Sequence, residues 1–239
     1  MKSDFPVIKT RASGFTLVEM AVGAFVLGLL VLVSTMLFRQ SVTSFRMTSW
    51  KQERLQEVQL FWNYLRKNLE EASDAIDIGG DVNISPRPLL HRSVPSTAGA
   101  LDGPVLRWMR SRMGASGIPE YRVECQVLLK SRSISLQISP SPGFTPPAEE
   151  LIPLPKRLLT DVTGFVIQTT AIRLDPVRGE YLGSGGAPIV GSLVEISIRF
   201  SPSPDSGLPN QLEITQNHKF KLTVDATPLA NPADFPPFL

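Results

Sequence analysis

Residues 15–38 read FTLVEMAVGAFVLGLLVLVSTMLF, and this stretch decides the fold. It holds one charged side chain, that of Glu19, and 18 of its 24 residues are apolar. A helix that rises 1.5 Å per residue would be roughly 36 Å long here, more than the ~30 Å hydrocarbon core of a bilayer. We therefore expect a transmembrane helix over residues 15–38.

Three other interpretations of the stretch fit less well. A cleaved secretory signal has a shorter apolar core and a small-residue cleavage site, whereas this run continues into polar residues without such a site. A buried helix of a soluble protein usually has a polar face, but residues 20–33 carry no polar side chain. A plain signal anchor fits the hydropathy and leaves Glu19 unexplained.

The charge of the chain is concentrated before this stretch. Lys2, Lys9 and Arg11 against Asp4 give residues 1–14 a net charge of +2, which is the net charge of the whole chain. The positive-inside rule then predicts a cytoplasmic N-terminus and places everything after Phe38 outside the cytoplasm. The weak overall charge argues against a protein that binds nucleic acid through a basic field, so no nucleic-acid partner is expected.

Glu19 is the informative residue of the stretch. A carboxylate inside a membrane span is energetically costly, so it suggests a function and a partner. The alternative is that Glu19 lies at the level of the lipid headgroups, four residues into the span, where substituting it would have little effect.

The residues around Glu19 carry a specific resemblance. The run Arg11-Ala12-Ser13-Gly14-Phe15-Thr16-Leu17-Val18-Glu19 resembles the class III signal of type IV prepilins and of type II secretion pseudopilins. The resemblance implies that prepilin peptidase removes residues 1–14 as a leader by cutting between Gly14 and Phe15. It also implies N-methylation of Phe15, with Glu19 fifth in the mature chain.

The resemblance also implies an assembly role for Glu19. Cleavage would create an amine at Phe15, and Glu19 would pair with that amine on a neighbouring subunit as the filament grows. An amine and a carboxylate in a low dielectric cost far less as a pair than separately. The implied partners are prepilin peptidase, other pilin or pseudopilin subunits, and the bacterial inner membrane before assembly.

The sequence differs from that of major pilins in two features. Major pilins usually have a helix-kinking proline where this chain has Met36, and no proline lies between Phe15 and Asn83. Major pilins also commonly have a C-terminal pair of cysteines, whereas this chain has Cys125 alone. Both differences favour a minor pilin or pseudopilin.

The helical pattern continues over residues 39–72. Leu55, Val58, Trp62, Leu65 and Leu69 recur at spacings of three and four, which places them on one face. Phe61 widens this stripe, and Arg54 is among the charged residues expected on the opposite faces. We expect the stripe to pack on a sheet of the same subunit; a coiled coil is less favoured because only about two heptads are present. A helix over residues 15–72 would be roughly 87 Å long. A globular domain of a 26.2 kDa chain cannot bury such a length, so the first half of the helix must protrude from the domain.

Residues 73–239 have a different composition and periodicity. They contain 20 of the 21 prolines, which excludes long helices, and several runs alternate apolar and polar residues. The expected strands are 105–109, 121–129, 133–138, 165–169, 194–200 and 220–224. One wet face per strand suggests antiparallel pairing, so the expected fold is α+β and pilin-like, with a long N-terminal helix on an antiparallel, periplasmic β domain.

A looser resemblance extends into this region. The helix end at residues 65–69, the segment Leu158-Leu159-Thr160-Asp161-Val162-Thr163-Gly164-Phe165 and the strand at 193–200 resemble the J-type minor pseudopilins and the W-type minor pilins. For the J type this implies a position near the tip of the filament.

No pattern typical of catalysis is present. The chain has no G-x-S-x-G, H-E-x-x-H or P-loop motif, so we expect no enzyme activity, no cofactor and no metal. Asp74, Asp77 and Asp81 do not have the spacing of a calcium-binding EF-hand, and solvated acids after a helix explain them better. Cys125 is expected to be a buried small residue. The order of the tail 225–239 is left open.

The sequence thus predicts a minor pilin or pseudopilin that is cleaved, methylated and assembled into a type II secretion pseudopilus or a type IV pilus. The alternative is a membrane-anchored adhesin or cargo-binding module of the cell envelope. Secretion and pilus systems are not distinguished, and neither is the cargo.

Overall fold

The computed structural model describes residues 16–70, 72, 89–100, 102–113, 119–209, 212–222 and 226–228. These residues form one long helix, ten strands and two short 3₁₀ turns. The chain divides into two compact units, residues 1–48 and residues 49–239.

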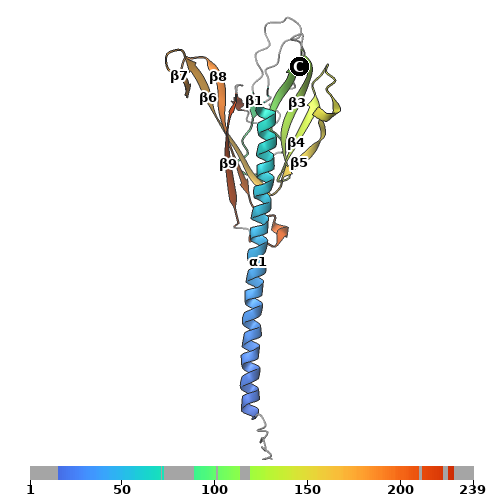
Figure 1. Ribbon diagram of the computed structural model, residues 1–239, viewed down its shortest axis with the longest axis vertical. Coiled ribbons are helices and arrows are strands. Elements are labelled where there is room, and N and C mark those ends of the chain that lie inside the picture. The colour runs from blue at the N-terminus through green and yellow to red at the C-terminus, as the bar shows by residue number, and fades with distance from the viewer. Residues whose placement is uncertain are drawn as a thin grey trace, which may run out of the picture. The chain divides into compact units, whose positions relative to one another are not determined.

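The helix α1 runs from Leu17 to Glu70, close to the expected 15–72 (Figure 1). Within the first unit its side chains are almost all exposed to solvent, including large apolar ones such as Phe25 and Phe38. An 18-residue window of this helix has a mean hydropathy of 2.5, and none of that window is buried. The helix is therefore long and apolar enough to cross a membrane once, or to act as a signal.

The second unit contains two sheets on either side of the last turns of α1 (Figure 1). The six-stranded sheet has the order β10-β1-β2-β3-β4-β5. Its strands are β1 (Leu89–His91), β2 (Gly103–Met113), β3 (Pro119–Lys130), β4 (Ser133–Pro140), β5 (Ile152–Leu159) and β10 (Ala226–Pro228). Its pairings are antiparallel except for β1 with β10, which are parallel.

The four-stranded sheet has the order β7-β6-β8-β9 and is antiparallel throughout. Its strands are β6 (Val162–Asp175), β7 (Gly179–Leu182), β8 (Ile189–Phe200) and β9 (Ile214–Leu222). The segment between β1 and β2 is joined to β6 by backbone hydrogen bonds: Val94 and Phe165 exchange both of theirs at 2.6 Å, and the N–H of Thr97 donates to the carbonyl oxygen of Thr163 at 2.8 Å. The fold class is α+β, as the change of periodicity predicted.

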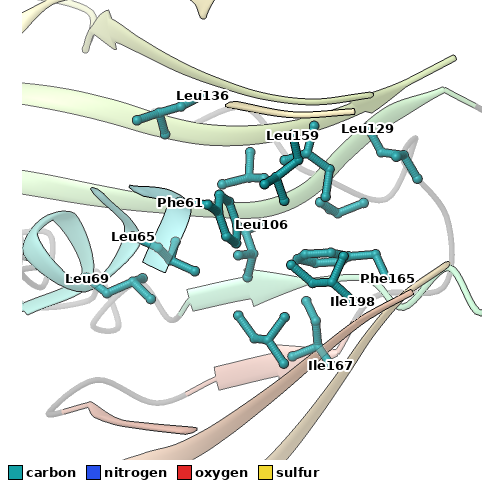
Figure 2. Close-up of a cluster of buried hydrophobic side chains, with 14 of the residues drawn as sticks. Phe61, Leu65, Leu69, Leu106, Leu129, Leu136, Leu159, Phe165, Ile167 and Ile198 are labelled. Atoms are coloured by element: carbon teal, nitrogen blue, oxygen red, sulfur yellow. The ribbon is translucent and has the colours of Figure 1, made fainter. Parts of the chain in front are cut away.

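One hydrophobic core forms where α1 meets both sheets. Figure 2 shows Phe61 and Leu65 of α1, Leu106 of β2 and Phe165 of β6 in the same buried cluster. The helix contributes Val58, Phe61, Leu65 and Leu69 to it, so most of the predicted stripe is confirmed. Cys125 is also fully buried in this core, as expected.

The stripe differs from the prediction at its beginning. Leu55 is 40% exposed, whereas Trp50 and Arg54 are buried. The expectation of an exposed Arg54 was wrong: its side chain is buried, and this burial is tolerated because its guanidinium pairs with Glu53 and Glu57 at 3.0 and 2.8 Å. The buried face is therefore shifted toward Arg54 in the first turns of the packed segment.

The proline-rich strand β5 was not predicted. Its sequence contains Pro153 and Pro155, and both lie on a strand that pairs only with β4 among the described strands. Proline cannot donate a hydrogen bond to a neighbouring strand, so an edge is where such a strand is tolerated. The expected strands in β2, β3, β4, β6 and β8 are confirmed with longer bounds. Of the expected strand at 220–224, residues 220–222 form the end of the longer β9, and residues 223 and 224 lie outside the described residues.

Candidate functional site

The residues implicated by the sequence lie at the start of α1. Gly14 and Phe15, the expected cleavage and methylation positions, lie outside the described residues, as do Asp74, Asp77 and Asp81. Glu19 is described, and it lies in the first turn of the helix. The geometry of the site is therefore the geometry of Thr16 and Glu19.

Thr16 and Glu19 bond to each other in both directions. The backbone N–H of Thr16 donates to Oε2 of Glu19 at 2.8 Å, and the Thr16 hydroxyl donates to the same oxygen at 2.9 Å. The backbone N–H of Glu19 in turn donates to Oγ1 of Thr16 at 3.2 Å. This reciprocal arrangement is a capping box, in which two N–H groups without intrahelical partners are satisfied.

The capping box explains the spacing of Thr16 and Glu19 and gives Glu19 a structural role that sequence reasoning missed. The T-x-x-E pattern ahead of an apolar run was the signal that could have revealed it. Oε2 takes both hydrogen bonds, and within the described residues Oε1 of Glu19 accepts none. The carboxylate is thus oriented by its own helix and keeps one oxygen for another partner. A negative charge in the first turn also interacts favourably with the helix dipole.

The apolar surface behind Glu19 is continuous. From Leu17 to Phe38 the large apolar side chains are between 43% and 86% exposed within the chain. Contiguous exposed apolar surface of this kind marks a site for a membrane or another protein. The first unit therefore combines one oriented carboxylate with a helix surface that requires an apolar environment.

The second unit holds its helix segment through polar contacts as well as the core. Nε1 of Trp50 donates to Oδ2 of Asp161 at 2.8 Å, and Oε2 of Glu57 accepts from the backbone N–H of Thr160 at 3.2 Å. Asp161 has a positive φ of 60°, which makes the tight connection from β5 to β6. The beginning of the packed segment is therefore fixed to the Thr160–Asp161 turn.

The end of the helix is fixed in the same manner to β2. Nε1 of Trp108 donates to the carbonyl oxygen of Asn68 at 3.0 Å, and Nη1 of Arg110 donates to its side-chain Oδ1 at 3.0 Å. Arg110 also pairs with Glu150, which follows β4. These contacts satisfy the carbonyl and amide groups of a buried helix end.

The segment that carried the looser resemblance is explained by this packing. Thr160 and Asp161 bind the helix, and Leu159, Val162 and Phe165 are fully buried. Gly164 leaves no room for a side chain, since a Cβ there would lie 2.7 Å from the carbonyl oxygen of Pro95. Each of these residue types is therefore required by the docking of the helix and the sheets.

The second unit buries several ionisable groups, some of them paired. Arg107 pairs with Glu124 at 2.5 Å across β2 and β3, and both side chains are nearly buried. His91 is 3% exposed, and neither of its ring nitrogens has a partner within the described residues. Burial lowers the pKa of His91 to about 4, which keeps the ring neutral at pH 7.

Among the described residues no group of three or more His, Cys, Asp or Glu side chains could hold a metal ion.

Comparison with protein-family models, with curated proteins and with solved structures gave no match. The described chain is consistent with a pilin-like architecture, because a long apolar N-terminal helix is followed by antiparallel sheets.

Proposed function

We propose that this chain is a minor pilin or pseudopilin subunit with a structural, non-catalytic role. In this proposal prepilin peptidase cuts between Gly14 and Phe15 and methylates Phe15. The mature chain then moves from the inner membrane into a type II secretion pseudopilus or a type IV pilus, near its tip. Before assembly it crosses the membrane once, with its N-terminus cytoplasmic and its second unit periplasmic.

The observation that carries the proposal is the single carboxylate at the start of an apolar helix segment, residues 17–38, whose large side chains are exposed. Residues 20–38 contain no charge that could neutralise Glu19 within the same helix. An ionised carboxylate at the edge of hydrocarbon is costly unless it meets a cation. The amine that cleavage would create at Phe15 of a neighbouring subunit supplies that cation, and Oε1 of Glu19 is free to receive it.

The apolar helix supports the same proposal. Its surface needs lipid before assembly, and helices of neighbouring subunits would replace that lipid in a filament. Because both environments are apolar, transfer between them would cost little hydrophobic free energy. The Glu19–amine pair would then decide when and in which register the transfer occurs.

The capping box allows the charge of Glu19 to be tested apart from its hydrogen bonds. Glutamine also serves at this position of a capping box, so Glu19→Gln keeps the acceptor for Thr16 and removes the charge. We expect Glu19→Gln to insert into the membrane normally and to be lost from sheared filaments, in a host that has the assembly machinery. Glu19→Ala should behave in the same way.

The matched control is Glu70→Gln, which removes another exposed carboxylate at the other end of α1. This variant should enter filaments as the wild type does. Normal incorporation of Glu19→Gln would contradict the charge-pair mechanism and leave the capping box as the whole role of Glu19. A second unit that retains secreted cargo in a pull-down, without filament incorporation, would instead favour the cargo-binding alternative.

A further inference from the structure

Residues 38–46 of α1, which follow the most apolar part of the helix, contain a repeated Phe-Arg pair. Phe38-Arg39 is followed seven residues later by Phe45-Arg46. Seven residues make almost two helical turns, so the two phenylalanines lie on one stripe and the two arginines on another, with about 10 Å between repeats. Phe38 and Phe45 are 70% and 72% exposed, and both arginines are exposed as well.

A shallow apolar groove leads along the helix to the first of these pairs. It has a volume of about 550 Å³, and its lining includes Leu27, Val31, Ser34, Thr35, Phe38 and Arg39. Ser34 and Thr35 are small, which hollows the surface between the larger side chains. The Thr35 hydroxyl donates to the carbonyl oxygen of Leu32 at 2.8 Å, so its hydrogen is used within the helix. The groove is thus apolar along its length and cationic at one end.

The dimensions of the groove match one leaflet of a bilayer. From Leu27 to Phe38 the helix rises roughly 16 Å, and half of a ~30 Å hydrocarbon core is about 15 Å. If residues 15–38 span the membrane, Arg39 reaches the level of the phosphates and Arg46 lies further out. Arginine is typical of this interface, because its apolar stem lies along hydrocarbon while its guanidinium reaches the water.

The charge of the segment selects the headgroup. Between Met20 and Thr48 the charged residues are Arg39 and Arg46, and no carboxylate is present. Neither arginine has an ion pair within the described part of the chain, so both cations are available. In a zwitterionic lipid the cationic group of the headgroup neutralises the charge of the phosphate. An anionic lipid has no such group, so it keeps a net negative charge that the two guanidinium groups can bind.

We propose that this face of α1, defined by the groove from Leu27 to Arg39 together with Phe45 and Arg46, binds an anionic phospholipid. One acyl chain lies in the groove, and the headgroup phosphate contacts Arg39 and Arg46. The site belongs to the leaflet that holds the C-terminal end of the span. It would retain the subunit in an anionic membrane until assembly. The inference rests on the membrane-spanning part of the proposed function, and not on cleavage or filament formation.

The test uses the full chain in mixed micelles with equal amounts of phosphatidylglycerol and phosphatidylcholine that have the same acyl chains. Native mass spectrometry counts the lipids that remain bound. A basic residue near an anionic surface contributes a factor of about five, so two should favour phosphatidylglycerol by roughly 25-fold. The doubly substituted Arg39→Gln/Arg46→Gln chain should lose this preference, and Arg39→Lys/Arg46→Lys should keep it.

Two further variants separate charge from shape. Lys67→Gln removes an exposed cation from the same helix outside the face and should leave the preference unchanged. Ser34→Leu/Thr35→Leu fills the groove and should reduce the binding of both lipids without changing their ratio. Unfolding of the second unit, followed by near-UV circular dichroism, should be the same in all variants.

Equal retention of the two lipids by the wild type would overturn the proposal. So would a preference that survives Arg39→Gln/Arg46→Gln. If those substitutions abolish self-association and leave lipid binding intact, the arginines pair with carboxylates of neighbouring subunits and the lipid site is wrong. The lipid site and the proposed function can fail separately. If Arg39→Gln/Arg46→Gln loses the lipid preference while Glu19→Gln enters filaments normally, the lipid site stands and only the proposed assembly mechanism fails.

Discussion

The two parts of the helix α1 differ in what surrounds the same regular backbone. In residues 17–38 apolar side chains cover almost the whole circumference of the helix and are exposed. In residues 49–70 most of the large apolar side chains lie on one face, which is buried between two sheets, whereas Leu55 and Leu60 are exposed among the charged residues of the other faces. The backbone alone therefore does not determine the environment of a helix. The distribution of side chains around it shows that the first part requires an apolar medium and the second part a protein core.

A matched pair of phenylalanines tests this difference most strongly. Phe61→Ala removes a fully buried ring from the core and should lower the free energy of unfolding by about 3–5 kcal/mol. Phe25→Ala removes the same ring from the exposed part, where the second unit gains no stability from it. Urea unfolding of the detergent-solubilised chain, followed by near-UV circular dichroism, measures both. Equal effects of the two substitutions would mean that the parts of the helix are not distinct in their packing.

A smaller effect is expected at the contact of the two sheets. Gly164→Ala places a Cβ within 2.7 Å of a backbone oxygen at Pro95, which forces the strand to shift. Overpacking of this kind costs about 1–3 kcal/mol. Gly186→Ala is the control, since a Cβ there meets nothing within 4 Å. If the midpoints of urea unfolding for Gly164→Ala and the wild type coincide, the sheets are not held closely at this point.

The smallest effect is expected from acid, and it should also be confined to the second unit, which holds both histidines. Burial lowers the pKa of His91 to about 4, against about 6.5 in an unfolded chain. The unfolded state therefore binds more protons between pH 6.5 and 4, and stability is lost as the pH falls through this window. Between pH 7 and 5.5 the loss should be roughly 1 kcal/mol.

Comparing the wild type with His91→Leu isolates this contribution from the carboxylates. The substituted chain should lose less stability over the same pH range when urea midpoints are compared. His218→Gln is the control: burial also lowers the pKa of His218, followed by the charge of Arg66, but its ring stacks on Trp62 and is less enclosed. A pH dependence that is identical in the wild type and His91→Leu would show that His91 is not protected from protons.

The sequence predicted the elements whose periodicity is strong. The apolar run, the continued helix and the alternating strands are local patterns, and each was found. Arg54 and Leu55 were assigned to the wrong faces because helical spacing does not show that ion pairs with Glu53 and Glu57 allow a guanidinium to be buried, nor that the buried face is shifted toward Arg54. The strand β5 was missed because Pro153 and Pro155 argue against a strand unless its place at a sheet edge is known.

The candidate site could be predicted in part. The T-x-x-E spacing of Thr16 and Glu19 is visible in the sequence, and the capping box follows from it. The bonds of Glu57 to Thr160 and of Trp50 to Asp161 join positions more than 100 residues apart, so no local pattern could indicate them. The same holds for the burial of His91, which depends on how the strands around it pack.

The proposed processing by prepilin peptidase is tested most directly by the mass of the N-terminal peptide of the chain extracted from membranes. The measurement uses a cell that makes prepilin peptidase and a matched cell that lacks it. We expect a chain that begins at N-methylated Phe15 in the first cell and at Met1 in the second. An intact Met1 in both cells, or cleavage elsewhere than after Gly14, would contradict it.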